Sequence, residues 1–437
     1  MSADASSAPD AAKAAHRHRI RNIIGGSAGN LVEWYDWYVY AAFTLYFAPV
    51  FFPAGDRTSE LLSAAAVFAV GFVMRPIGAW IMGIYSDRNG RKAGLTLSVT
   101  LMCLGSLLIA VTPTYASIGA LAPAILVVAR MMQGLSVGGE YGASATYLSE
   151  MAGRKRRGFY SSFQYVTLIS GQLIALAVLL VLQATMPEAE LEAWGWRIPF
   201  AIGAVLAVVV FYIRRRLAET ESFRNAQGTD KPRSSGLNLF RDHPKEAFLV
   251  MALTAGGTLA FYAYTTYMQK FLVNTSGFGR ETASQVMTLA LFLFMCLQPV
   301  AGALSDRVGR KPVMVTFGIL GMVLTVPIFT ALEQVRDPLT GFLLVLAALV
   351  IVTGYTSINA VVKAELFPAH IRALGVALPY AIANTMFGGT AEYVALWLKD
   401  VGMERAFYWY VAGMIGVSLI VYLRMRDTKH HSQILED

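Results

Sequence analysis

A ten-residue segment occurs twice in this chain, and the repeat restricts the fold more than any other sequence feature. Residues 83–92 read GIYSDRNGRK and residues 302–311 read GALSDRVGRK, so both copies follow the pattern G-x-x-S-D-R-x-G-R-K. Each copy is a short charged link between two long apolar segments, and about half of the 437 residues separate the copies. An internal repeat of this kind predicts two similar membrane halves joined by a linker.

The composition is typical of a protein with many membrane-spanning segments. The chain is 56% hydrophobic and 15% charged, whereas soluble domains contain about 45–50% apolar and about 25% charged residues. A net charge of +8 would suggest a nucleic-acid partner for a soluble protein. Here the basic residues lie in short loops between apolar segments, so we interpret the charge as a topology signal and expect no nucleic-acid partner.

Twelve apolar segments are each long enough for the ~20 residues that a transmembrane helix needs. The predicted fold class is therefore an all-α membrane protein with twelve transmembrane helices in two pseudo-symmetric six-helix halves. The segments cover about residues 23–52, 60–86, 92–112, 120–150, 158–185, 195–215, 246–274, 281–305, 312–332, 338–366, 370–398 and 403–424.

A long hydrophilic segment near the middle of the chain separates the two predicted halves. Basic residues cluster in this linker and in alternate loops, whereas the opposite loops are acidic or nearly uncharged. Because cytoplasmic loops carry the excess of Lys and Arg, we expect both termini and the linker on the cytoplasmic side. The expected parts are a disordered cytoplasmic N-terminal tail at 1–20, the N-terminal half at 21–216, the linker at 217–245, the C-terminal half at 246–425 and a cytoplasmic C-terminal tail at 426–437.

Five charged residues of the N-terminal half are predicted to lie at membrane depth. Arg75 precedes Asp87 by twelve residues, which at ~1.5 Å per residue places it about 18 Å inside the cytoplasmic end. Ionisable groups at that depth cost at least ~2.5–3.5 kcal/mol each, so they are candidates for function, although static ion pairing between helices is the alternative for each. The second repeat has Gln298 and Pro299 upstream instead of an arginine, so we expect binding weighted to the N-terminal half. The five residues are Glu33, Asp36, Arg75, Arg130 and Glu140.

This mixture of arginines and acids predicts an anion site combined with a proton relay. Arginine suits a carboxylate because its planar fork donates two parallel hydrogen bonds and stays charged, so Arg75 is the first candidate for a substrate contact. An arginine that moves from an acid onto an anionic substrate changes the proton affinity of that acid. We prefer Asp36 with Arg130 as the coupling pair, with Glu33 and Glu140 as secondary candidates.

Two lysines and several polar side chains complete the predicted substrate site. Lys270 and Lys363 lie nearer to helix ends, so each is either a second substrate contact or an anchor whose stem reaches the membrane interface. Polar residues at three- or four-residue spacing on several helices favour a central aqueous cavity, although hydrogen bonds between helices explain any single stripe. The residues expected to shape the cavity are Tyr38, Gln164, Tyr262 and Asn384.

The repeated segment and its flanking helices resemble the cytoplasmic loop signature of the major facilitator superfamily. GNLVEWYDWY at 29–38, RPIG at 75–78, QGLSVGGEYG at 133–142 and ELFPAHIR at 365–372 resemble the metabolite–proton symporters within it. The resemblance runs from about residue 20 to 425 and implies rocker-switch alternating access between the halves. It implies that Asp87, Arg91, Asp306 and Arg310 belong to networks that close a cytoplasmic gate.

Further segments are similar to the 2-oxoglutarate carriers of that family, namely SSFQYVTLI at 161–169, WGWRIPF at 194–200, TTYMQK at 265–270 and GGTAEYVAL at 388–396. They imply import of a small dicarboxylate, 2-oxoglutarate first, by proton symport across a bacterial inner membrane. Other members carry zwitterions, citrate or shikimate on the same frame. A proton-coupled carrier of proline, betaine or citrate is therefore the first alternative, and competition against labelled 2-oxoglutarate uptake would separate the two.

The sequence contains no Walker motif, metal-binding cluster or triad spacing. We therefore expect no enzymatic activity, no metal and no cofactor, with the proton gradient as the driving force. The expected partners are the dicarboxylate, protons and the lipid bilayer, and the expected functional unit is a monomer. A second alternative is a nutrient receptor that signals through the linker without transport, which accumulation of substrate in liposomes would exclude.

Overall fold

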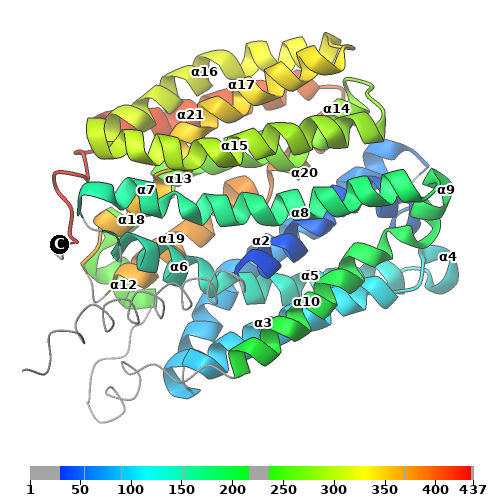
Figure 1. Ribbon diagram of the computed structural model, residues 1–437, viewed down its shortest axis with the longest axis horizontal. Helices are drawn as coiled ribbons and strands as arrows, with labels where there is room; N and C mark the ends of the chain where they lie inside the picture. Colours follow the sequence, from blue (N-terminus) through cyan, green and yellow to red (C-terminus); the bar gives the residue numbers. More distant parts are fainter. Residues whose placement is uncertain are drawn as a thin grey trace, which may run out of the picture.

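The computed structural model describes residues 30–53, 55–89, 91–150, 152, 154–215, 236–368 and 371–434. The regular secondary structure of this part is helical, without a strand. Most helices run along the long axis of the molecule (Figure 1). The first part holds a helix over residues 30–51, then α2 (Arg57–Asn89), α3 (Arg91–Val111), α4 (Tyr115–Ile118), α5 (Leu121–Gly138), α6 (Glu140–Glu150), α7 (Arg157–Ser161), α8 (Phe163–Thr185), α9 (Glu188–Glu190) and α10 (Arg197–Arg215).

The second part begins inside the predicted linker, whose last residues form the short helix α12 (Gly236–Asp242). The rest of that linker, like the predicted N-terminal tail, lies outside the described residues. The following helices are α13 (Pro244–Tyr262), α14 (Met268–Asn274), α15 (Arg280–Val308), α16 (Arg310–Gln334), α17 (Pro338–Thr356), α18 (Asn359–Glu365), α19 (Arg372–Ala383), α20 (Ala391–Asp400) and α21 (Glu404–Arg424). Two π-helical turns, Ala263–Tyr267 and Asn384–Gly388, join α13 to α14 and α19 to α20.

The described helices account for the twelve predicted spans. Eight helical segments are long and apolar enough to cross a membrane, and the bent pair of Glu188–Gly195 with Arg197–Tyr212 makes a ninth. The other three predicted spans correspond to the helix at 30–51, to α3, and to α19 with α20, which a π-helical turn interrupts. The chain thus has the all-α, twelve-helix membrane fold that the apolar segments predict.

Local sequence sets where α17 begins. Asp337 precedes α17 and its carboxylate accepts hydrogen bonds from the Thr340 hydroxyl at 2.7 Å and the Thr340 backbone N–H at 2.8 Å. These hydrogen bonds lower the pKa of the Asp337 carboxyl. Pro338 follows at the first helical position, where its missing N–H leaves no unmade bond.

Glycines allow α2 and α5 to cross closely, and this crossing positions the functional side chains. A Cβ on Gly134 would fall against the carbonyl of Gly71, and one on Gly138 would fall against the carbonyl of Arg75. Small residues at a crossing let two helix backbones approach. The backbone of Arg75 is therefore fixed directly against α5, the helix that carries Arg130.

Helices from the two parts of the chain pack against each other across the middle of the molecule. α15 packs on α7 and α8, and α19 packs on α6 and α2. Thr385 Oγ1 donates to the carbonyl of Phe72 at 2.7 Å. In Figure 1, α6, α7 and α18 lie at one end of the molecule, called here the α18 end, and α9 and α14 lie at the other, called the α14 end.

Candidate functional site

Arg75 is a buried cation whose hydrogen-bonding capacity is largely unused. Its Cζ atom lies 4.0 Å from the ring centroid of Trp37 and 4.1 Å from that of Phe72. Its Nε and Nη2 atoms are buried and have no hydrogen-bond partner among the described residues. A buried donor without a partner costs about 1–3 kcal/mol, so this guanidinium is well suited to receive an anion.

Tyrosines from both parts of the chain surround Arg75. The hydroxyl groups of Tyr38, Tyr262 and Tyr380 are close enough to interact electrostatically with one another or with Arg75. The ring of Tyr262 packs edge-on against Phe72, with centroids 5.1 Å apart. Tyr38 Oη has no hydrogen-bond partner in the described part of the chain. The predicted residue Tyr38 therefore lies near Arg75, and Tyr262 packs on Phe72, whose ring contacts Arg75.

A small cavity of about 10 Å³, enough for about one water molecule, adjoins this site between the two parts of the chain. The first part lines it with Tyr38 and Gln172, and the second part with Thr265, Thr266 and Gln269. All five side chains are buried, and apolar side chains complete the lining. The central aqueous cavity that the sequence stripes favour stays a prediction.

The other two predicted cavity residues are buried. Asn384 begins the π-helical turn of the α19–α20 segment, and its Oδ1 accepts from Thr258 Oγ1 at 2.6 Å. Its Nδ2 has no hydrogen-bond partner among the residues that the structure describes. Gln164 lies at the start of α8 with its side chain buried.

Lys363 on α18 is buried among neutral groups. Its Nζ donates to Asn359 Oδ1 at 2.7 Å and to Tyr141 Oη at 3.3 Å, and it lies 3.8 Å from the ring centroid of Tyr380. The alternative of an anchor that reaches the membrane interface is wrong for Lys363, because the side chain is 0% exposed. The hydroxyl group of Tyr380 also interacts electrostatically with Arg75.

Lys270 is also buried, but its charge is matched by an acid. Its Nζ lies 2.9 Å from Glu392 Oε2, with the two side chains 0% and 5% exposed. The interfacial anchor is therefore wrong for Lys270 as well. Because Glu392 already compensates its charge, Lys270 is less suited than Lys363 to bind a second carboxylate.

Asp36 and Arg130 are close, but they do not form the direct pair that the sequence analysis drew. Arg130 Nη1 donates to Gln133 Oε1 at 2.7 Å, and Gln133 Nε2 donates to Asp36 Oδ2 at 3.3 Å. Ser106 Oγ donates to the same Asp36 oxygen. The amide of Gln133 therefore occupies the place between the acid and the arginine.

Of the two secondary acids, the structure describes the side chain of Glu33 but not that of Glu140. Glu33 is buried one helical turn before Asp36, and its Oε1 accepts from Ser98 Oγ at 3.1 Å and from Ser136 Oγ at 3.4 Å. It therefore belongs to a hydroxyl network beside Asp36. The side chain of Glu140 lies outside the described residues.

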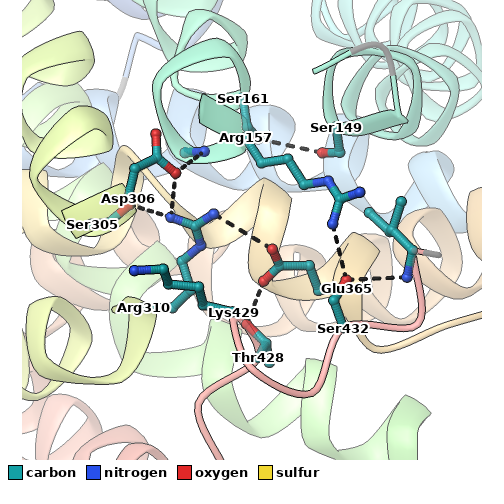
Figure 2. Close-up of polar contacts among 12 residues, drawn as sticks. Ser149, Arg157, Ser161, Ser305, Asp306, Arg310, Glu365, Thr428, Lys429 and Ser432 are labelled. Carbon is teal, nitrogen blue, oxygen red and sulfur yellow. Dashed lines mark hydrogen bonds and ion pairs between the residues drawn. The ribbon is translucent and has the colours of Figure 1, made fainter. Parts of the chain in front are cut away.

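Asp306 and Arg310, from the second repeat, form a network at the α18 end (Figure 2). Asp306 accepts from the backbone N–H groups of Gly158 and Phe159 at 2.8 and 2.9 Å, so it contacts the start of α7 in the first part of the chain. Arg310 Nη1 lies 2.8 Å from Asp306 Oδ1, and its Nη2 lies 3.5 Å from Glu365 Oε1. The corresponding side chains of the first repeat, Asp87 and Arg91, lie outside the described residues.

The segment after α21 takes part in this network, which the sequence analysis did not foresee. Thr428 Oγ1 donates to Glu365 Oε2 at 2.6 Å, and Arg157 Nη1 donates to Ser432 Oγ at 3.4 Å. Figure 2 shows both hydroxyl groups directed at the network from the C-terminal segment. We call residues 425–434 the strap, because they connect Arg157 of the first part with Glu365 of the second.

Several functional neighbours were missed by the sequence analysis. Gln133 follows Arg130 by three residues, a helical spacing that places both on one face. This spacing would have allowed a prediction that the two side chains lie close together. Ser106, Tyr141 and Tyr380 meet their partners only through the packing of different helices, which no spacing along the chain reveals.

Comparison with known proteins identifies the family of the chain. The chain matches the Major Facilitator Superfamily over residues 37–378 and 271–436. It is 56% identical over 412 residues to an α-ketoglutarate permease of Escherichia coli strain K12, covering 94% of each chain. It is 32% identical to a citrate–proton symporter of Klebsiella pneumoniae, covering 94% and 93% of the two chains, and 30% identical to a proline/betaine transporter of E. coli strain K12, covering 93% and 83%.

Solved structures support the fold. The xylose transporter XylE from E. coli, in a partially occluded inward open conformation, superposes with a TM-score of 0.73 at 18% sequence identity, covering 93% of this chain and 97% of that one. At this identity the likeness concerns the fold alone.

Proposed function

Because the chain belongs to the Major Facilitator Superfamily, we propose that it imports 2-oxoglutarate together with protons by alternating access between its two halves. The 56% identity to an α-ketoglutarate permease over nearly the whole length supports this substrate. The observation that carries the proposal is the buried guanidinium of Arg75, whose Nε and Nη2 have no partner among the described residues.

Two cations suit the two carboxylates of 2-oxoglutarate. Arg75 lies on α2 in the first half and Lys363 on α18 in the second, where it contacts the ring of Tyr380. We assign one carboxylate to Arg75 and the other to Lys363, while Tyr38, Tyr262, Gln164 and Asn384 shape the cavity. A ligand held by both halves favours their closure, because it gains both contacts only when the halves approach.

The charge of the site favours a dianion over a zwitterion. A zwitterion such as betaine has one carboxylate and cannot match both Arg75 and Lys363. The remaining predicted substrate lysine, Lys270, is already paired with Glu392 at 2.9 Å. Lys363 contacts only neutral groups among the described residues. Citrate, an anion, is the closer alternative, and the citrate–proton symporter is 32% identical to this chain.

Proton coupling is assigned to Asp36, with Arg130 as its partner through Gln133 and with Glu33 and Glu140 as secondary acids. Asp306 and Arg310, together with Asp87 and Arg91 of the first repeat, are proposed to hold a cytoplasmic gate closed. We place the protein in a bacterial inner membrane as a monomer with both termini and the linker in the cytoplasm, driven by the proton gradient without a cofactor. An inner membrane metabolite transport protein of E. coli, 32% identical to this chain, supports this location.

Uptake of radiolabelled 2-oxoglutarate into proteoliposomes, with and without an inward proton gradient, tests the proposal. We expect gradient-driven accumulation by the wild type, its loss in Arg75→Lys, and competition by unlabelled succinate rather than by betaine or proline. Arg197→Lys is the matched control, because Arg197 also lies over an indole, 4.1 Å from the ring centroid of Trp196, but away from Arg75. Transport of betaine or citrate in place of 2-oxoglutarate would overturn the substrate, and equal transport by Arg75→Lys and wild type would overturn the anion site.

A further inference from the structure

The amide of Gln133 separates a buried cation from a buried anion and is oriented to suit both. Its Oε1 accepts from Arg130 Nη1 at 2.7 Å, whereas its Nε2 donates to Asp36 Oδ2 at 3.3 Å and to Ser106 Oγ at 3.0 Å. All four side chains are buried. The oxygen end of the amide faces the positive charge and the nitrogen end faces the negative charge.

This orientation suits the charged carboxylate of Asp36, and it does not suit a carboxyl that carries its proton on Oδ2. Asp36 Oδ2 accepts hydrogen bonds from both Gln133 and Ser106, and a protonated carboxyl at that oxygen needs an acceptor instead. Turning the Gln133 amide over brings Oε1 toward Asp36, and the last torsion of glutamine has two roughly equivalent wells. The turn also brings the NH2 group toward Arg130, which is a donor without an acceptor, and so breaks the 2.7 Å bond.

We propose that Gln133 is a positioning residue whose amide turns over when Asp36 binds a proton and thereby releases Arg130. The proton forms an O–H bond on the Asp36 carboxyl and leaves to water when the carboxylate is restored, and no other covalent bond changes. This inference rests on the proposed function, since it assigns the route by which the proton site and the anion site communicate.

Few other charged or titratable groups face Asp36 in the described part of the chain. Arg130 faces it from α5 and Cys103 from α3, and Tyr35 and Glu33 precede it on its own helix, Glu33 by one turn. On α10, Gly203 leaves room for Asp36 Oδ1, because a Cβ there would fall on that oxygen. Of these groups only Arg130 is a cation, and the amide of Gln133 is what connects it to the carboxylate.

Release of Arg130 reaches the substrate site through Trp37. The Cζ atoms of Arg130 and Arg75 lie 4.1 and 4.0 Å from the ring centroid of the same indole. Like charges this close interact strongly where water is excluded. A change in the position of Arg130 therefore alters the field at Arg75, which is assigned to a substrate carboxylate.

Infrared difference spectroscopy tests the turn without any substrate. We expect a pH step on the purified protein to produce a carboxylic-acid band from Asp36 together with a shift of a side-chain amide band. The amide shift should be absent from both Asp36→Asn and Gln133→Leu. It should persist in Gln298→Leu, the matched control. Gln298 is also a buried amide, but among the described residues it bonds to Thr356 at 2.9 Å and to the Phe294 carbonyl at 3.2 Å, both neutral groups. An amide shift that persists in Gln133→Leu, or none in the wild type, would overturn the proposal.

Transport by the same variants tests the consequence. With the membrane potential clamped, a one-unit inward pH gradient supports about tenfold accumulation for each proton carried. We expect this accumulation to vanish in Gln133→Leu. It should also vanish in Gln133→Glu, because a carboxylate presents an acceptor oxygen to both Asp36 and Arg130 in either orientation. In both variants substrate counterflow should stay near the wild-type rate. Accumulation and counterflow that fall in parallel would indicate a structural role and overturn the proposal. A wild type that moves no 2-oxoglutarate would contradict the proposed function alone, because the infrared test does not depend on it.

Discussion

Trp37 allows two like charges to lie close together inside the membrane part of the protein. Arg75 and Arg130 both contact its indole, at 4.0 and 4.1 Å from the centroid. A desolvated cation over an indole gains about 2 kcal/mol, which offsets part of the repulsion between the arginines. Because the ring uses none of the guanidinium donors, these remain available to a ligand and to Gln133.

Truncation of Trp37 should therefore weaken substrate binding. Loss of about 2 kcal/mol of cation–π stabilisation in Trp37→Leu is expected to raise the Kd for 2-oxoglutarate about tenfold or more, measured by calorimetry on the purified protein. Trp196→Leu is the control, because it removes an indole under Arg197 away from the site. An unchanged Kd in Trp37→Leu would show that the ring does not position Arg75 for the ligand.

Lys363 should determine whether the second carboxylate is recognised. Truncating one partner of a buried charge contact costs about 2 kcal/mol or more, so Lys363→Met should weaken binding of 2-oxoglutarate by about thirtyfold. Binding of 2-oxobutyrate, which lacks the second carboxylate, should change little in the same variant. Equal losses for both acids would place Lys363 outside the substrate contact.

For individual residues, the sequence predicted the buried charges but not their partners. A charge inside an apolar segment is visible in one chain, so Arg75, Asp36 and Arg130 stand out. Lys363 was ambiguous, because the burial that excludes an interfacial anchor comes from Tyr141 and Tyr380 on other helices. The relation between Asp36 and Arg130 depends on Gln133 and Ser106, whose positions follow from helix packing.

Among the elements, the crossing of α2 and α5 places the most demands on individual residues. Gly138 of α5 lies so close to α2 that an added Cβ would fall against the backbone carbonyl of Arg75. Backbone atoms cannot move aside as the end of a side chain can. The same contact that brings the helices together also fixes the position of the Arg75 backbone relative to α5.

Substitution at this crossing should lower stability more than substitution on a lipid-facing surface. Gly138→Ala is expected to cost about 1–3 kcal/mol through overpacking, seen as a lower Tm in detergent. Gly413→Ala on α21 is the control, because an added Cβ there meets nothing within 4 Å. A Gly138→Ala protein as stable as Gly413→Ala would mean that the helices can separate without loss.

The apolar segments predicted the twelve spans well because each span has the composition that a bilayer requires. Their internal breaks were not predicted. The π-helical turns Ala263–Tyr267 and Asn384–Gly388 follow or contain the site residues Tyr262 and Asn384, and such turns often mark functional sites.

Across the whole molecule, the two halves contact each other at both ends. At the α14 end, Arg280 Nη1 lies 2.5 Å from Glu192 Oε1 and 3.1 Å from Glu188 Oε1. At the α18 end, Asp306 accepts from the first turn of α7, and the strap adds Thr428 and Ser432. Alternating access requires each set of contacts to break in turn, so the strap should stabilise closure of the α18 end.

Loosening the strap should open that end more often. Thr428→Val removes a hydrogen bond to the buried Glu365 carboxylate, a kind worth about 1.5–3 kcal/mol, so a cysteine at Ser161 should react with a maleimide about tenfold faster or more. The labelling is done in detergent on a protein that also carries Cys103→Ser and Cys296→Ser, so that the introduced cysteine is the one that reacts. Thr275→Val is the matched control, because Thr275 bonds to Glu404 at 2.5 Å at the opposite end. Equal labelling rates in the two variants would assign the strap no part in closure.

The strap also has a consequence for how the protein is made. The strap, residues 425–434, follows all twelve membrane helices in the sequence, so the ribosome synthesises it after every span. Until Thr428 and Ser432 leave the ribosome, Glu365 and Arg157 lack these two bonds, although the helices that carry them already exist. The bonds that complete closure of the α18 end therefore form last, after the final span has left the ribosome.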